Sequence, residues 1–168
     1  MTSDLSSFDE AAERYQIERL KYAYMRCLDT KLWDEMRTLF VPDAVGEWSG
    51  GKLHYEGVDA IMAFLTESMS SERFLSSHRV HHPEIDFISP TEAKGVWALE
   101  DTVVMEEWNL LLQGAAFYED AYRKVDGRWL FARTGYRRTF EYVIPTTTIP
   151  GFRLTASLWG TDGQSQLV

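Results

Sequence analysis

The chain has 168 residues, 45% of them hydrophobic and 26% charged, which is typical of one globular domain and argues against disorder. Its net charge of −9 argues against a nucleic-acid-binding surface, which needs a basic face, and mildly against attraction to anionic membranes. Because there is one cysteine and no signal-peptide pattern at the N-terminus, we expect a cytoplasmic protein without an intrachain disulfide.

The first element is predicted to be a helix over about residues 8–28. Ser7-x-x-Glu10 has the form of a capping box, and apolar residues recur behind it at helical spacing. Tyr24 lies on this apolar stripe, where most tyrosines are core residues with a satisfied hydroxyl. Asp29 follows the end of the stripe, and either Asp29 or Thr30 is placed to cap the next helix. The helical pattern alone therefore assigns no chemistry to Tyr24 or Asp29.

A second helix, with Phe40 on its apolar face, is predicted to end at Pro42. Two short strands are expected at residues 44–48 and 53–55, around a Gly-Gly turn. A third helix is expected to begin after Gly57.

The hydrophobic period then changes to two, which predicts four long strands joined by short connections. These strands span about residues 76–88, 93–105, 114–125 and 128–142. Helices followed by an antiparallel meander indicate an α+β fold, with a long sheet curled around the helices and a pocket at one end. We expect residues 1–142 to form the domain. Residues 143–168 are too apolar for a free tail, so we expect this extension to cover the pocket or a subunit interface.

Asp101 is the only charge on the apolar face of the strand at 93–105. A buried carboxylate is costly unless it is paired, and an arginine, a histidine or a backbone amide would satisfy it without any catalysis. The turn before this strand places residues 78–82 roughly opposite residues 99–103. We therefore expect a histidine close to Asp101, although the register does not say which one.

The histidines of His78-Arg79-Val80-His81-His82 do not form a metal site by this pattern. In a strand, His78 and His82 are about 13 Å apart, and His81 points to the opposite face. A histidine beside an aspartate is a different device, because the carboxylate binds one imidazole nitrogen and leaves the other as a base. No phosphate loop, dinucleotide fingerprint or nucleophile elbow is present. Proton transfer without a cofactor is the chemistry that these residue types favour.

Five blocks of the sequence resemble one known family. They are YMRCLDTKLWDE from Tyr24, SHRVHHPEI from Ser77, WALED from Trp97, GAAFYEDAYRKVDGRW from Gly114 and TGYRR from Thr134. In order and spacing, these blocks resemble the SnoaL-like branch of the NTF2-like superfamily, and most closely its bile acid 7α-dehydratase type. The resemblance implies a cone in which N-terminal helices pack inside a strongly curved, antiparallel or mixed sheet with a deep pocket. Because this fold hosts isomerases, dehydratases, hydrolases and binders, the superfamily alone implies little about function.

The resemblance also implies the site residues. The catalytic candidates are Tyr24, Asp29, His78 and Asp101, and the candidates for substrate binding are Arg138, Trp97 and Tyr118. Strand alternation places Arg138 inside the cone and Arg137 on the other face. The family has a second histidine at the position of His81 but none at the position of His82.

The activity that the resemblance implies is a cofactor-independent lyase, which removes water from a hydroxylated, steroid-like or polycyclic enone. His78, oriented by Asp101, would be the base, and Tyr24 would donate to the developing oxyanion. Asp29 would assist the leaving hydroxyl or orient Tyr24, and Arg138 would place a substrate oxygen. The alternatives are proton transfer of the ketosteroid isomerase kind and a non-catalytic module that binds hydrophobic ligands.

The expected partners are a small hydrophobic substrate and further copies of the chain. The substrate is expected to be a steroid or its coenzyme A thioester, for which Arg133, Arg137 and Arg138 would supply a local basic patch. The family and the apolar tail imply a homo-oligomer, with a trimer considered before a dimer.

Overall fold

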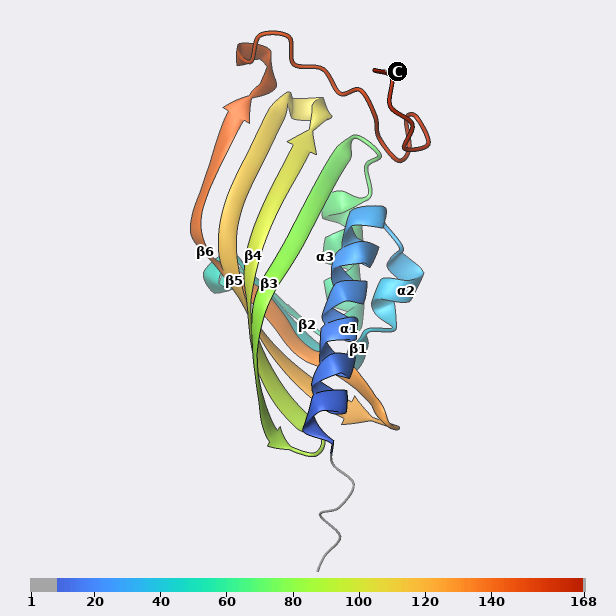
Figure 1. Ribbon diagram of the computed structural model, residues 1–168, viewed down its shortest axis with the longest axis vertical. Helices are drawn as coiled ribbons and strands as arrows, with labels where there is room; N and C mark the ends of the chain where they lie inside the picture. The colour runs from blue at the N-terminus through green and yellow to red at the C-terminus, as the bar shows by residue number, and fades with distance from the viewer. Residues whose placement is uncertain (1–8, 168) are drawn as a thin grey trace, which may run out of the picture.

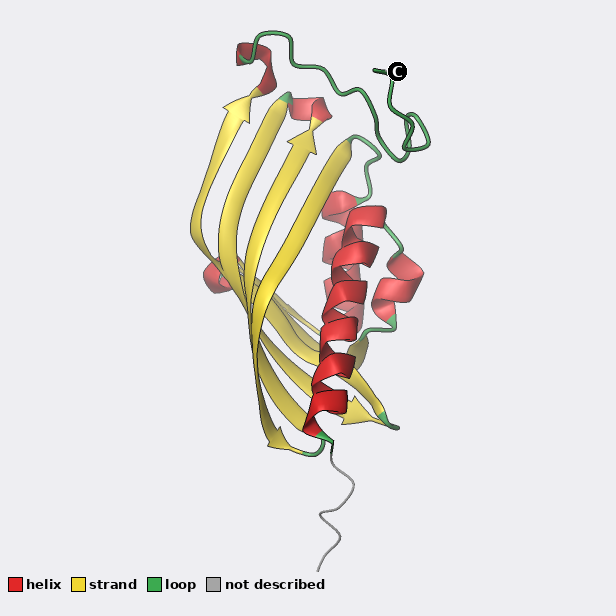
Figure 2. Ribbon diagram, in the orientation of Figure 1, coloured by secondary structure: helices red, strands yellow, loops and turns green. Residues whose placement is uncertain are grey.

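The computed structural model describes residues 9–167 and has an α+β architecture, as predicted (Figures 1 and 2). The capping role predicted for Ser7 lies outside the described residues. The helices are α1 (Glu10–Thr30), α2 (Trp33–Arg37) and α3 (Val58–Met69). The strands are β1 (Phe40–Trp48), β2 (Leu53–Glu56), β3 (Phe74–Ser89), β4 (Glu92–Met105), β5 (Leu110–Val125) and β6 (Arg128–Pro145). None of the described helices is long and apolar enough to cross a membrane.

The six strands form one mixed sheet in the order β2-β1-β6-β5-β4-β3. Only β1 and β6 pair in parallel, and all other neighbours are antiparallel. The long strands curve and twist, and the helices lie on the concave side of the sheet (Figure 1). β3 is an edge strand, and α1 lies beside it.

Helix α1 is fixed at both ends by its own sequence. Asp9 is the N-cap, and its carboxylate accepts hydrogen bonds from the amides of Ala11 and Ala12. At the other end, Lys31 adopts the left-handed conformation (φ 56°) and stops the helix. The buried stripe of the helix, which includes Ile17 and Leu28, packs into the core.

Two predictions about element boundaries are wrong. Helix α2 ends at Arg37, so Phe40 and Pro42 belong to β1 rather than to a helix. Pro42 lies where the pairing of β1 with β6 changes register, so its missing N–H leaves no gap in a regular ladder. β5 begins at Leu110 rather than at Gly114, because the ladder with β4 continues to the end of that strand.

A buried ion pair holds α1 against the sheet in the closed half of the cone. The Lys21 ammonium donates to Asp120 at 2.7 Å, and both side chains are fully buried. Asp120 also accepts from the hydroxyls of Tyr122 and Thr134, so its oxygens are well satisfied. Burial lowers the pKa of Lys21 to about 8, although Asp120 acts against this shift. Lys21 and Asp120 are 99 residues apart in the sequence, so their spacing does not predict this pair.

Candidate functional site

Three segments meet at the candidate site: the C-terminal turn of α1, the first half of β3 and the middle of β4. His78 and Asp101 are direct partners in the β3–β4 ladder, so the expectation of a histidine close to Asp101 is confirmed. Directly opposite residues share a face of the sheet, and both side chains therefore lie on the concave side.

The prediction that Asp101 is the partner of His78 is wrong, because the imidazole binds Asp29 instead. The Asp29 carboxylate accepts from His78 Nδ1 at 2.7 Å, from the His78 amide at 2.8 Å and from the Ser76 hydroxyl at 2.8 Å. Asp29 is therefore not the cap of α2, whose N-cap is Leu32. At the free edge of β3, its carboxylate accepts the His78 backbone N–H, which would otherwise bond to a further strand.

This contact fixes which nitrogen of His78 can act as a base. An ionised carboxylate only accepts hydrogen bonds, so Nδ1 carries the proton and Nε2 keeps its lone pair in the neutral ring. Among the described residues, no group forms a hydrogen bond with His78 Nε2. The His78 side chain is 9% exposed, so the ring is held but not sealed off.

Asp101 pairs with Arg138 in a two-pronged contact next to the imidazole. The guanidinium donates from Nη1 at 2.6 Å and from Nη2 at 2.7 Å, while the Asp101 side chain is only 3% exposed. Arg138 Nε lies 3.0 Å from a Glu141 oxygen, but not with the geometry of a hydrogen bond. Burial opposes the charge of Arg138, yet the bonds to Asp101 raise its pKa above the usual value. The arginine is thus a fixed cation, and its buried Nε–H forms no hydrogen bond with the described residues.

Gly114 leaves the space that this ion pair occupies. A Cβ at this position would lie 2.7 Å from Arg138 Nη1 and 3.1 Å from Asp101 Oδ1. We expect Gly114→Ala to displace the pair and to lower the free energy of unfolding by about 1–3 kcal/mol, as overpacking typically does. Denaturant unfolding measures this loss, with Ala115→Gly as the neighbouring control. Unchanged stability together with an intact Asp101–Arg138 contact in a crystal structure would contradict the packing argument.

Tyr24 is fully buried, with its ring against Phe40, Phe131 and Tyr118. Its hydroxyl lies near the polar groups of Tyr118 and Trp48, but it makes no hydrogen bond of good geometry with any described residue. A buried hydroxyl without a partner is costly, and a bound ligand oxygen would satisfy it. Burial raises the pKa of Tyr24, so the group stays a neutral donor near pH 7.

The structure places Trp97 and Tyr118, the two aromatic residues predicted to bind substrate, in the core. Trp97 is fully buried and donates to the Tyr122 hydroxyl at 2.8 Å. Tyr118 is 1% exposed, and the Lys21 ammonium lies 3.4 Å from its ring centre. Both side chains pack in the closed half of the cone, so they support the site through core packing.

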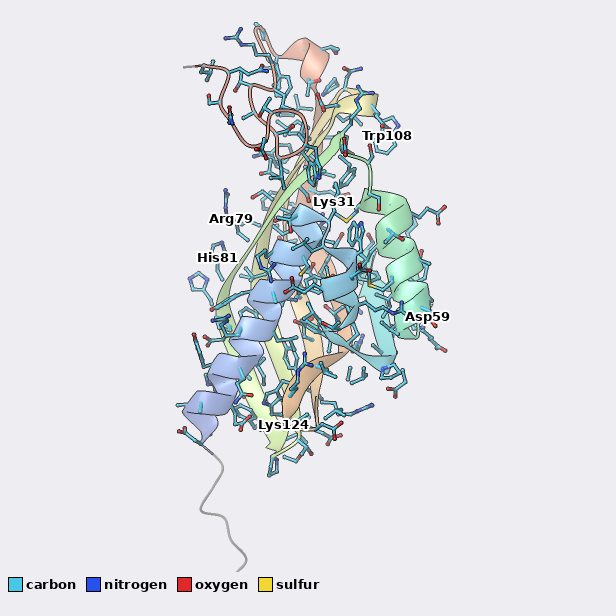
Figure 3. The ribbon with its side chains drawn as sticks, turned by 90° about the vertical axis from the view of Figure 1, so that its right-hand side faces the viewer. Lys31, Asp59, Arg79, His81, Trp108 and Lys124 are labelled. Atoms are coloured by element: carbon cyan, nitrogen blue, oxygen red, sulfur yellow. The ribbon has the colours of Figure 1, made fainter. Side chains whose placement is uncertain are left out.

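The predicted basic patch is divided by the sheet. Arg138 faces the concave side, whereas Arg133 and Arg137 alternate with it and lie on the convex side. Arg133 is already paired with Glu47. Like Arg79, His81 projects away from the helices (Figure 3), and its imidazole lies 3.7 Å from Glu100. These side chains do not join the Asp29–His78 pair.

The comparisons with known proteins agree with this architecture. The SnoaL-like domain family matches residues 9–135 of the chain. A proposed scytalone dehydratase of Novosphingobium aromaticivorans is 28% identical, with a TM-score of 0.74, over 79% of this chain and 88% of its own. The hexachlorocyclohexane dehydrochlorinase LinA-type3 of Novosphingobium barchaimii LL02 is 20% identical, with a TM-score of 0.75, over 90% of this chain and 100% of its own.

ActVI-ORFA of Streptomyces coelicolor is 13% identical, with a TM-score of 0.65, over 76% of this chain and 98% of its own. At 20% and 13% identity, the dehydrochlorinase and ActVI-ORFA show the fold alone. The family match covers most of the chain, and the six-stranded curved sheet is the cone of the NTF2-like superfamily. The chain belongs to the SnoaL-like domain family.

Proposed function

We propose that the protein is a cofactor-independent dehydratase that acts on a hydroxylated, polycyclic or steroid-like enone. The observation that carries this proposal is the Asp29–His78 pair, in which Nδ1 is bound and Nε2 forms no hydrogen bond with any of residues 9–167. An imidazole held in this way is suited to take a proton from carbon at neutral pH. Asp29 thus has the orienting role that the family resemblance implied for Asp101.

The elimination needs no group other than this histidine for its proton balance. His78 Nε2 takes a proton from the carbon next to the substrate carbonyl, and the resulting enolate expels the hydroxyl from the following carbon. The imidazolium returns the proton to the departing oxygen, so that water leaves and His78 is neutral again. Because His78 both removes the proton from carbon and returns it to the departing oxygen, no second acid needs to face the leaving group.

Two donors are available for the negative charge of the enolate. The Tyr24 hydroxyl, which makes no well-formed hydrogen bond within the described part of the chain, supplies one from the buried side. Arg138 supplies a fixed positive charge, because Asp101 holds it from the other side. In this assignment Asp101 positions Arg138, and it touches neither the substrate nor the base.

The relatives support an elimination reaction. One is named as a proposed scytalone dehydratase and another as a hexachlorocyclohexane dehydrochlorinase. Their names describe the loss of water and of hydrogen chloride, and a single proton-accepting base serves both reactions. The resemblance of the sequence blocks to the bile acid 7α-dehydratase type favours a steroid or its coenzyme A thioester as the substrate.

The test is a product assay with matched pairs of hydroxylated and non-hydroxylated enones, each as the free acid and as the thioester. We expect loss of water from a hydroxylated member, measured by mass spectrometry. Deuterium exchange or double-bond migration without water loss would point to an isomerase. A raised Tm with every ligand and turnover with none would contradict catalysis and favour a binding module.

We further propose that the convex face of the sheet joins copies of the chain into a trimer or a dimer. Phe117, Phe140 and Tyr142 share this face of β5 and β6, and each is about half exposed. The rings of Phe140 and Tyr142 are stacked at 6.4 Å and 4°. Exposed aromatic clusters of this kind typically mark an interface.

Phe140→Asp should therefore lower the oligomeric mass measured by light scattering, because it would place a charge among aromatic rings. Tyr15→Asp, on the outside of α1 and 57% exposed in the wild type, is the control. A wild-type chain that is monomeric at micromolar concentration would refute the proposed interface.

A further inference from the structure

The C-terminal segment, residues 149–167, crosses the open end of the cone. It leaves the end of β6, passes over the ends of β5, β4 and β3, and reaches the C-terminal end of α1 (Figure 1). A cavity of about 300 Å³ lies beneath its first part, lined by Phe152 and Leu154 of the segment and by Arg73 and Val104 of the rim. The segment therefore bridges the mouth without packing tightly on the strand ends.

The second part of the segment is a small folded unit. The Gly163 amide donates to the Ser157 carbonyl at 2.9 Å, and the Gln166 amide donates to the Thr155 carbonyl at 2.8 Å. Among residues 9–167, no hydrogen bond joins the segment to helices α1–α3 or to the sheet. Its docking must therefore depend on side-chain packing and on the contact of Trp159 with Lys31.

Lys31 contacts the segment, and Figure 3 shows it at the end of α1 beside the segment. Its ammonium lies 4.5 Å from the centre of the Trp159 ring. The same ammonium donates to the Met69 carbonyl at 2.6 Å and to the Phe74 carbonyl at 2.9 Å. Two of its three N–H donors thus bind the ends of α3 and the start of β3, and the ring lies within reach of the third.

The backbone conformation of Lys31 indicates that its side chain is needed. A left-handed residue at the end of a helix is usually glycine, because other residues are strained there. A lysine with φ 56° carries that strain, and the strain is offset only if its side chain forms stabilising contacts.

Lys31 and Asp29 connect the same two parts of the chain. Lys31 binds the carbonyl of Phe74, and Asp29 binds Ser76 and His78 farther along β3. The two contacts are two residues apart on α1 and close together on β3. Lys31 therefore holds the start of the same strand that carries His78.

We propose that Lys31 is a positioning residue that couples the docking of Trp159 to the Asp29–His78 pair. When Trp159 is seated, the ammonium is held by three partners and anchors the start of β3. When the segment lifts to admit a ligand, Lys31 loses one partner and the edge of β3 loosens at His78. This inference rests on the proposed function, because it concerns how His78, the proposed base, is held in position.

Amide hydrogen exchange in the ligand-free protein, resolved by NMR, tests this coupling. The probes are the Gly163 amide in the segment and the His78 amide, which is bonded to Asp29. An exposed cation–π contact corresponds to about a two- to fivefold change in an equilibrium. We expect Trp159→Ala and Lys31→Met to speed exchange at both amides by about this factor.

Two matched variants control the test. Leu158→Ala removes an apolar side chain that is 48% exposed in the same turn, and it should leave both rates unchanged. Lys31→Arg keeps a cation over the ring and should stay close to the wild type. Trp159→Ala removes only the ring from the partners of Lys31 and deletes no group of α1 or β3, so any effect on His78 must pass through a weaker hold of Lys31 on the Phe74 carbonyl.

Unchanged exchange of both amides in Trp159→Ala would refute the proposal. Faster exchange of Gly163 with unchanged exchange of His78 would refute the coupling. Because the measurement needs no substrate, a failed dehydratase assay leaves it interpretable, and a failed coupling leaves the dehydratase proposal standing.

Discussion

Replacing His78 with alanine is expected to lower the rate of dehydration by about 100- to 10,000-fold, the usual range for a positioned general base. The reason is that His78 Nε2 is the proposed base. The Asp29 carboxylate cannot act as the base instead, because it is bonded to Ser76 and to the His78 amide of β3. Steady-state turnover of the substrate found in the product assay measures the loss. Circular dichroism and Tm should stay near the wild type, because the side chain lies at the edge of the sheet.

His81→Ala is the matched control for this variant. His81 is in the same strand, but its side chain is 41% exposed and points away from the site. Its loss should leave turnover within about twofold, as expected of a surface substitution. Equal losses in both variants, or full activity in His78→Ala, would remove His78 from the mechanism.

Asp120→Asn is expected to have the largest effect on stability. It leaves the ammonium of Lys21 buried without a counter-charge, and removal of one partner of a buried pair costs about 3–5 kcal/mol. In a chain of this size, the loss corresponds to a fall in Tm of roughly 6–20 °C. Differential scanning calorimetry measures it.

Two further variants make this prediction specific. Asp43→Asn removes an exposed carboxylate paired with Arg123 and should leave Tm near the wild-type value. The double variant Lys21→Met, Asp120→Asn removes the unpaired ammonium and keeps a side chain that can bond the hydroxyls of Tyr122 and Thr134, so it should recover much of the lost stability. If Asp120→Asn unfolds at the wild-type temperature, the pair does not hold α1 in the cone.

The fold could be predicted from the sequence because its patterns are local. The change from helical spacing to strict alternation after residue 75 separates the helices from the four long strands, and the β3–β4 register follows from the turn between them. The position of a histidine opposite Asp101 in the ladder could therefore be predicted from the sequence. The boundary at Phe40 was not, because a short apolar run fits a helix and a strand equally well.

The chemistry of the site depends on contacts between distant segments, which spacing does not reveal. Whether His78 binds Asp101 or Asp29 depends on how α1 docks against the edge of β3, and Asp101 is satisfied by Arg138 from the other side. The same limit applies to Lys21 and Asp120, which are 99 residues apart in the sequence. A lysine on the apolar stripe of α1 was nevertheless a local sign that a buried partner exists.

The central claim is that Asp29 fixes His78 with the proton on Nδ1 and the lone pair on Nε2. Long-range ¹H–¹⁵N correlation NMR of ¹⁵N-histidine-labelled protein at neutral pH measures this tautomer directly, with His78→Gln for assignment. The account predicts a protonated Nδ1 and an unprotonated Nε2 in the wild type and in Asp101→Asn, and loss of this preference in Asp29→Asn. A His78 ring protonated on Nε2 in the wild type, or a tautomer that depends on Asp101 and not on Asp29, would contradict it.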